Sequence, residues 1–238
     1  MIMVYGGGIY CQLVSSSVIT GNTIERNWAD GFLASGGGIG VCDVAQANNL
    51  IITMNTIRGN HAYACGGAIS LVYSSPSVSF NTITANNVEA DYGVGGGAVY
   101  CGDECGAQIV NNAICGNQVI AGSSDGGALF FGPGSSPTIE NCTLSVNRVI
   151  CSTGQGGGIS CKGSASGTKV RNTISWGNQV VHGSQTLSSE IALRSGADLE
   201  VDYSDVYGGS SVYQESGCTL VWNGNLDPPA NPLRRADE

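Results

Sequence analysis

One tetrapeptide recurs along this chain at a fixed spacing, and the spacing limits the fold more than any other feature. The pattern is a run of glycines, or of glycines and one alanine, followed by an aliphatic residue. Its six aliphatic positions are 30 residues apart: Ile9, Ile39, Ile69, Val99, Leu129 and Ile159. A period of this length is typical of repeat proteins whose units contact only their neighbours. We therefore expect a solenoid.

A second signature, N-T-I-x-x-N or a near variant, lies in each repeat. Its aliphatic residues are Ile24, Ile57, Ile83, Ile114, Leu144 and Ile174, and its last residues are Asn27, Asn60, Asn86, Asn117, Asn147 and Asn178. An earlier row contains Asn22, Asn55, Asn81, Asn112 and Asn172, with Cys142 replacing one member. We interpret both rows as structural ladders, because stacked amides can hydrogen-bond from coil to coil and Asn tolerates left-handed bends.

The segments around these signatures are short, rich in Val, Ile, Thr and Ser, and interrupted by glycine, which predicts strands and almost no helix. Stacking them in register would align aliphatic residues into one buried column. The expected fold class is all-β, a right-handed single-stranded parallel β-helix of about seven coils of about 30 residues. A degenerate seventh copy surrounds Ile191 and Val206. We assign residues 1–209 to the β-helix and 210–238 to an irregular exit or cap segment.

Composition narrows the functional classes. The 37 glycines lack the three-residue period and the proline content of collagen, and a net charge of -9 disfavours nucleic acid as a partner. No apolar run is long enough to span a bilayer. Of the ten cysteines, Cys11, Cys101 and Cys161 fall on a predicted core row, where buried thiols are favoured over disulfides. So many cysteines in a chain poor in lysine favour an extracellular setting.

With these motifs in place, the chain resembles the secreted bacterial right-handed parallel β-helix repeat proteins, including those with polymorphic-outer-membrane-type GGAI repeats. The last coils contain R-N-T-I-S-W-G-N, S-E-I, D-Y-S-D-V-Y-G-G and G-N-L-D-P-P-A-N-P-L. Asn225, Leu226 and Asp227 fit the compact exit motif of that family, whereas two prolines and Ala230–Asn231 depart from it. The resemblance implies an extracellular or cell-surface location and further domains in a longer chain.

Candidate site residues are few. Positions just after the repeated aliphatic residue should point outward, so Tyr100 and Phe130 should be exposed neighbours suited to sugar stacking, with Tyr10 in the same row. Asp43, Asp103 and Glu104 lie nearby in the repeat, and a solvated turn is the competing interpretation. His61 and His182 each lie in a predicted turn after a ladder asparagine and are four coils apart, so they should not act together. No catalytic residue, metal site or cofactor is assigned.

We therefore expect a noncatalytic β-helical segment of an exported bacterial surface protein. It would serve as a rigid spacer or an adhesion surface, with a polysaccharide or a host or neighbouring cell surface as the candidate partner. The alternative function is a carbohydrate-active enzyme of the lyase, hydrolase or epimerase type, because such enzymes cluster carboxylates and basic groups on one exposed face.

Overall fold

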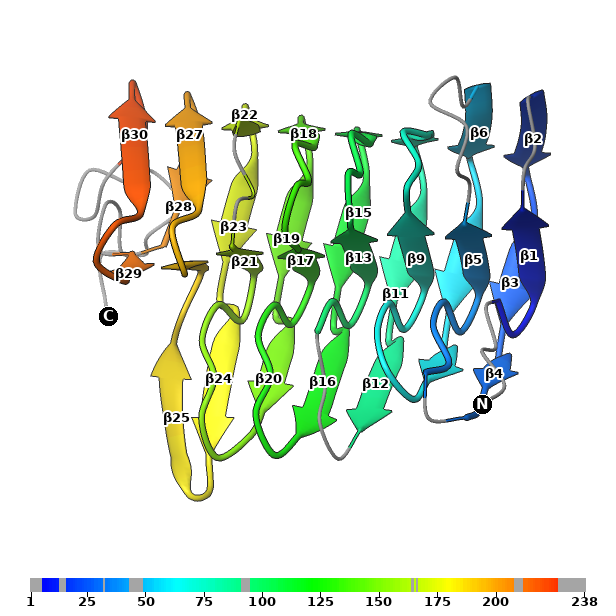
Figure 1. Ribbon diagram of the computed structural model, residues 1–238, viewed down its shortest axis with the longest axis horizontal. Coiled ribbons are helices and arrows are strands. Elements are labelled where there is room, and N and C mark those ends of the chain that lie inside the picture. Colours follow the sequence, from blue (N-terminus) through cyan, green and yellow to red (C-terminus); the bar gives the residue numbers. More distant parts are fainter. Residues whose placement is uncertain are drawn as a thin grey trace, which may run out of the picture.

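The computed structural model describes residues 6–12, 16–31, 33–42, 49–90, 95–163, 165, 167–207 and 212–226. These residues form 30 strands that are stacked along one axis (Figure 1). The described residues contain no helix, so no described segment is an apolar helix that could cross a membrane.

Each complete turn contributes four short strands, and each strand pairs in parallel with its equivalent in the next turn. The first sheet contains β1 (Ile9–Gln12), β5 (Ile39–Cys42), β9 (Ile69–Val72), β13 (Val99–Gly102), β17 (Leu129–Phe131), β21 (Ile159–Lys162), β26 (Ile191–Arg194) and β29 (Tyr213–Gln214). The second sheet contains β2 (Ser16–Thr20), β6 (Asn49–Thr53), β10 (Ser77–Ser79), β14 (Gln108–Val110), β18 (Thr138–Glu140), β22 (Thr168–Arg171), β27 (Asp198–Asp202) and β30 (Thr219–Asn223).

Two further sheets complete the turn. The third contains β3 (Thr23–Glu25), β7 (Thr56–Arg58), β11 (Thr82–Thr84), β15 (Ala113–Cys115), β19 (Thr143–Ser145), β23 (Ile174–Trp176) and β28 (Asp205–Val206). The fourth contains β4 (Trp28–Ala29), β8 (His61–Ala62), β12 (Asn87–Ala90), β16 (Gln118–Ala121), β20 (Arg148–Ile150), β24 (Gln179–His182) and β25 (Gln185–Ser188).

The fold is thus an all-β, right-handed parallel β-solenoid, which confirms the fold class predicted from the repeat. The aliphatic residues of the glycine motif pair in register, as in Ile9 with Ile39 and Ile159 with Ile191. Six turns have all four strands in parallel order, and a seventh has three. Within the predicted exit segment 210–238, β29 and β30 add two more parallel strands to the first and second sheets.

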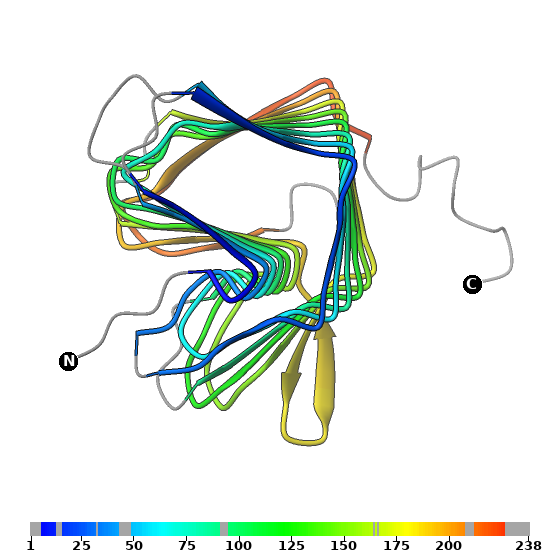
Figure 2. The same ribbon diagram turned by 90° about the vertical axis from the view of Figure 1, so that its right-hand side faces the viewer.

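The cross-section has two lobes, as the view along the axis shows (Figure 2). The first three sheets enclose the main core, which includes the inward cysteines Cys101 and Cys161 beside Leu71 and Phe131. All ten cysteines are thiols. The fourth sheet and the segment that returns from it enclose a smaller core around Ala62, Val88 and Val119, and a neighbouring one around Val149 and Val180.

The glycine runs lie where the two lobes meet, a junction that we call the waist. The first glycine of each run has a positive φ, 69° at Gly36, which strongly favours a residue without a side chain. The second glycine meets the fourth strand, because a Cβ on Gly37 would lie 2.4 Å from the carbonyl oxygen of His61. Glycine at these positions therefore lets two backbone segments touch, and the period of 30 residues is the period of this contact.

Two side-chain ladders hold the turns in register. In the ladder at the bend before the fourth strand, Asn117 accepts hydrogen bonds from the backbone N and Nδ2 of Asn86, at 3.0 and 2.9 Å. Asn117 in turn donates from N and Nδ2 to Oδ1 of Asn147, both at 3.0 Å. Its Nδ2 also donates to the carbonyl of Ile83 in the preceding turn. Each amide therefore ties together three successive turns.

The left-handed residue at these bends is not the ladder asparagine, which corrects the conformational part of the prediction. It is the residue just before, as at Arg26, Ala85 and Val146, with φ of 55°, 54° and 50°. This conformation is rare for a β-branched residue such as Val146. The asparagine amide that follows secures the bend by satisfying backbone groups on both sides.

The register also differs from the prediction in the sixth turn. Leu144 pairs with Ser175 rather than with Ile174, so the inward position holds a hydroxyl. The earlier ladder likewise continues through Cys142, Thr173 and Ser204 rather than through Asn172, which occupies the left-handed position. The cause is visible in the sequence, because N-T-I-S-W-G-N has one residue more than the other copies.

The ladder at the bend before the fourth strand ends in a carboxylate, that of Glu190. Oε1 of Glu190 accepts from the backbone N of Asn178 at 3.0 Å, and Oε2 accepts from Nδ2 of Asn178 and from Oγ of Ser175. Beside it, the fourth sheet ends in the hairpin of β24 and β25, its one antiparallel pair among the described residues. Burial raises the pKa of Glu190 to about 6, against the opposing effect of these hydrogen bonds.

Replacing Asn117 by alanine tests the ladder. In a fully buried site, the change would remove the acceptor of the backbone N of Asn86, one acceptor of its Nδ2 and the donor to Oδ1 of Asn147, so we expect a loss of about 3–5 kcal/mol in the free energy of unfolding. Urea denaturation followed by circular dichroism measures it. Thr82→Ala, at an exposed position of the same sheet, is the control and should change stability by less than about 0.5 kcal/mol. Equal effects of the two changes would contradict a stabilising role for the ladder.

Glu190 predicts a pH dependence of stability. Its folded pKa of about 6 lies above the ordinary glutamate value of 4.5, so folding favours the protonated form. The contribution is fully present below pH 4.5 and is lost as the pH rises through 6, amounting to about 2 kcal/mol. The difference in unfolding free energy between the wild type and Glu190→Gln, measured across this range, should carry that slope. A constant difference would refute the assignment.

Candidate functional site

The aromatic pair predicted on the first sheet is present but is not an exposed surface. Tyr100 and Phe130 occupy paired positions of β13 and β17, and their rings stack with centroids 5.7 Å apart. Phe130, however, is only 2% exposed, and burial raises the pKa of Tyr100 far above its usual range. The expectation of an exposed pair is therefore wrong.

The reason is the second lobe. The chain returning from the fourth sheet runs along the outer face of the first sheet, and its residues Ser35, Cys65, Gly95 and Asp125 form a row of parallel bridges there. A Cβ on Gly95 would lie 3.0 Å from the ring of Phe130. Tyr10, in the first turn, retains 43% exposure. Most of the outward side of the first sheet is thus covered by the second lobe and buried.

The predicted acidic residues lie at turns. Asp103 and Glu104 follow β13 in an exposed turn, and both have left-handed backbones with φ of 38° and 55°. Asp43 lies outside the described residues. His61 lies on β8 and His182 at the end of β24, four turns apart, so the described positions do not bring the two imidazoles together.

A groove of about 510 Å³ lies at the waist, between the returning segment and the ends of β21 and β26. Both carboxylate oxygens of Asp125 accept from Nη1 of Arg194, at 2.8 and 2.7 Å, although Asp125 is 69 residues away in sequence. Nε of Arg194 donates to Glu215 at 2.9 Å, and Lys162 lines the same groove. The Asp125 side chain is only 4% exposed, so this ion triad is the buried electrostatic link between the lobes.

The triad is a poor proton-transfer device. The hydrogen bond from Arg194 holds the pKa of Glu215 below its usual range. Burial lowers the pKa of Arg194, but the hydrogen bonds that it donates to Glu215 and Asp125 outweigh this effect and raise the pKa overall. An acid–base catalyst works best with a pKa near the working pH. These charges instead stabilise one another.

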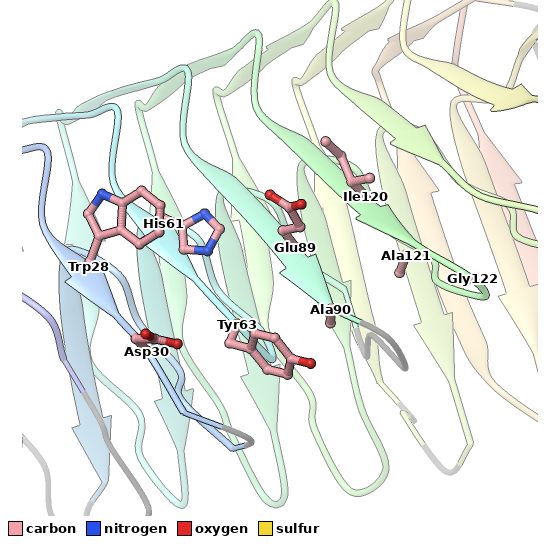
Figure 3. A pocket seen from close by; sticks show the side chains of 9 residues that line it. All are labelled: Trp28, Asp30, His61, Tyr63, Glu89, Ala90, Ile120, Ala121 and Gly122. Atoms are coloured by element: carbon pink, nitrogen blue, oxygen red, sulfur yellow. The ribbon is translucent and has the colours of Figure 1, made fainter.

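A second hollow, of about 690 Å³, lies on the outer face of the fourth sheet (Figure 3). The strands β4, β8, β12 and β16 and the residues just after them provide its lining, which consists of Trp28, Asp30, His61, Tyr63, Glu89, Ala90, Ile120, Ala121 and Gly122. Alternation along these strands points Ala29, Ala62, Val88 and Val119 inward. The side chains on either side of them therefore face outward.

Aromatic rings dominate one end of this hollow. The rings of Trp28 and His61 stack with centroids 4.2 Å apart, and Trp28 remains 66% exposed. Nδ2 of Asn87 lies 3.3 Å from Nδ1 of His61, which helps to orient the imidazole. Burial lowers the pKa of His61, against the opposing charges of Glu89 and Asp30, so the imidazole is neutral at neutral pH. Among the described residues, no three His, Cys, Asp or Glu side chains form a metal-binding group.

Sequence reasoning did not find this hollow because it placed His61 in a turn. The residues that follow the ladder asparagines directly, such as Trp28 after Asn27 and His61 after Asn60, in fact begin a fourth strand. The signal was present, since alternation around Ala29, Ala62, Val88 and Val119 marks a small inward row. Strands of two residues are too short for the pattern to be distinguished from a loop.

Residues 4–114 match a family model described as the right handed beta helix region. No curated protein and no solved structure matches the chain. The match spans the first turns, and the same four-strand turn continues beyond it through β24. The matched segment and the rest of the described chain therefore share the fold of a right-handed parallel β-helix.

The ion triad predicts a large asymmetry between single and double variants. Arg194→Met leaves the buried carboxylate of Asp125 unpaired and should cost about 3–5 kcal/mol in unfolding free energy. Adding Asp125→Asn should restore at least about half of that loss. As a control, Arg58→Met removes an exposed pair with Glu25 and should cost less than about 1 kcal/mol. Additive effects in the Arg194/Asp125 cycle, measured by chemical denaturation, would argue against coupling.

Proposed function

We propose that the chain is a noncatalytic β-helical segment of an exported surface protein, and that it acts as a rigid spacer that presents a glycan-binding face. The observation that carries the binding role is the aromatic hollow on the fourth sheet. There, an exposed Trp28 ring stacks on His61, with Tyr63, Asp30 and Glu89 around it (Figure 3).

The chemistry of this hollow suits a sugar. The C–H face of a pyranose ring packs on a flat indole, while carboxylates and a phenol hydroxyl offer partners for its hydroxyl groups. Strands hold functional side chains more rigidly than loops do. Because β4, β8 and β12 are neighbours in one sheet, the hollow extends along the axis from the Trp28–His61 platform to Glu89, and an extended oligosaccharide could follow that direction.

The spacer role is supported by the way in which the turns are joined. Amide ladders and a continuous apolar column connect every complete turn to the next, so bending the rod would break several contacts at once. Export and a surface location are supported by the resemblance to secreted β-helix repeat proteins.

The enzyme alternative rests on Asp125, Arg194 and Glu215, where two carboxylates and a guanidinium converge within hydrogen-bond reach beside the groove at the waist. We favour the noncatalytic function because Arg194 engages both carboxylates. Asp125 is also buried beneath it, which leaves neither group free to exchange a proton with a substrate.

Trp28→Ala tests the proposed function. On a glycan array and by titration calorimetry, the wild type should bind a subset of glycans, and the variant should lose about tenfold or more in affinity because the stacking platform is removed. Tyr203→Ala removes an aromatic side chain that is 71% exposed elsewhere on the rod, and should leave binding unchanged.

Two results would contradict this proposal. Absence of binding to any glycan, or equal loss in the Trp28 and Tyr203 variants, would remove the adhesion role. Release of new reducing ends or unsaturated products from a polysaccharide, abolished by Glu215→Gln, would favour the enzyme instead.

A further inference from the structure

We propose that the hollow on the fourth sheet selects amino sugars that carry a free ammonium group, over neutral or acidic sugars. This inference rests on the proposed glycan-binding function and deepens it by naming the ligand class. It is carried by the charge of the lining, together with the exposed aromatic rings that stand beside that charge (Figure 3).

The lining contains two carboxylates and no lysine or arginine. Asp30 follows β4 directly and Glu89 lies on β12, two turns away, which is roughly 10 Å by the spacing of paired strands. Both residues are exposed, and neither forms an ion pair with a described lysine or arginine. The hollow is therefore an uncompensated negative site.

Several other carboxylates of the rod form ion pairs with lysine or arginine. Glu25 pairs with Arg58, Glu200 with Lys169, and Asp125 with Arg194. On the fourth sheet, the described basic residue is Arg148, on β20, two turns beyond β12. Its guanidinium is not part of the lining. A cation is thus the missing partner in the hollow.

An ammonium group on a sugar can interact with this lining in two ways. It can form an ion pair with Asp30 or Glu89, because a charge pair near a protein surface is stronger than one in bulk water. It can also approach the faces of Trp28 and Tyr63, which attract cations. The neutral imidazole of His61 extends the indole platform without repelling the ligand.

The same arrangement disfavours acidic sugars. A uronate would place its carboxylate near Asp30 and Glu89, on a chain whose net charge is already -9. An N-acetylated sugar could still stack on Trp28 and donate hydrogen bonds from its hydroxyls to the carboxylates, but it would lack the ion pair. The expected order of affinity is therefore free amine, then N-acetyl, then uronate.

The experiment compares three probes of equal length by titration calorimetry: a glucosamine tetramer, its N-acetylated counterpart and a galacturonate tetramer. The wild type should bind the glucosamine tetramer about tenfold more tightly than the acetylated one, and added salt should reduce the difference. Glu89→Gln and Asp30→Asn should each weaken glucosamine binding about fivefold and weaken binding of the acetylated probe less than about twofold, because an amide oxygen still accepts from a sugar hydroxyl but carries no charge. Glu104→Gln, in an exposed turn outside the hollow, is the matched control.

The outcomes separate this inference from the proposed function. Equal binding of the amine and N-acetyl probes, or preference for galacturonate, would overturn the amino-sugar assignment and leave glycan binding intact. No effect of Glu89→Gln and Asp30→Asn on glucosamine binding would overturn it as well. No binding of any glycan would overturn both.

Discussion

The hydrogen bond from one turn to the next is the interaction on which the rest of this structure depends. Backbone hydrogen bonds join the strands, but parallel pairing alone would allow one strand to shift in register relative to the next. The buried ladder amides fix the register, because each hydrogen-bonds to groups in the turns before and after its own. Where asparagine is missing, Cys142, Thr173, Ser204 and Glu190 take over the role. The ladder thus tolerates changes of residue type but not loss of an acceptor.

The glycine waist converts a simple coil into a rod with two lobes. A side chain on Gly37 would collide with the neighbouring backbone, so the contact exists only with glycine there. The returning segment then covers the outer face of the first sheet, which buries Phe130. The fourth sheet, in contrast, keeps an open outer face. This partition places the candidate site on the smaller lobe and the ion pair of Asp125 and Arg194 between the lobes.

Much of the candidate site lay beyond sequence reasoning, for a physical reason. Tyr100 and Phe130 do stack in adjacent turns, as their spacing predicts, yet alternation says only that they point away from the main core. Whether such a side chain meets water depends on what folds over it. Likewise, Asp125 and Arg194 are 69 residues apart, and only the path of the returning chain brings them together.

By itself, the sequence determined the turn length, the strands around the two repeated signatures, the right-handed parallel stack and the asparagines of both ladders in the first five turns, because each follows from residues repeated at a fixed period. Tertiary structure alone decided that there are four sheets rather than a single smooth coil. It also decided that Ser175 is the inward residue of the sixth turn and that Trp28 and His61 form the exposed platform. A repeat encodes contacts between equivalent positions, whereas exposure depends on contacts between different positions of the turn.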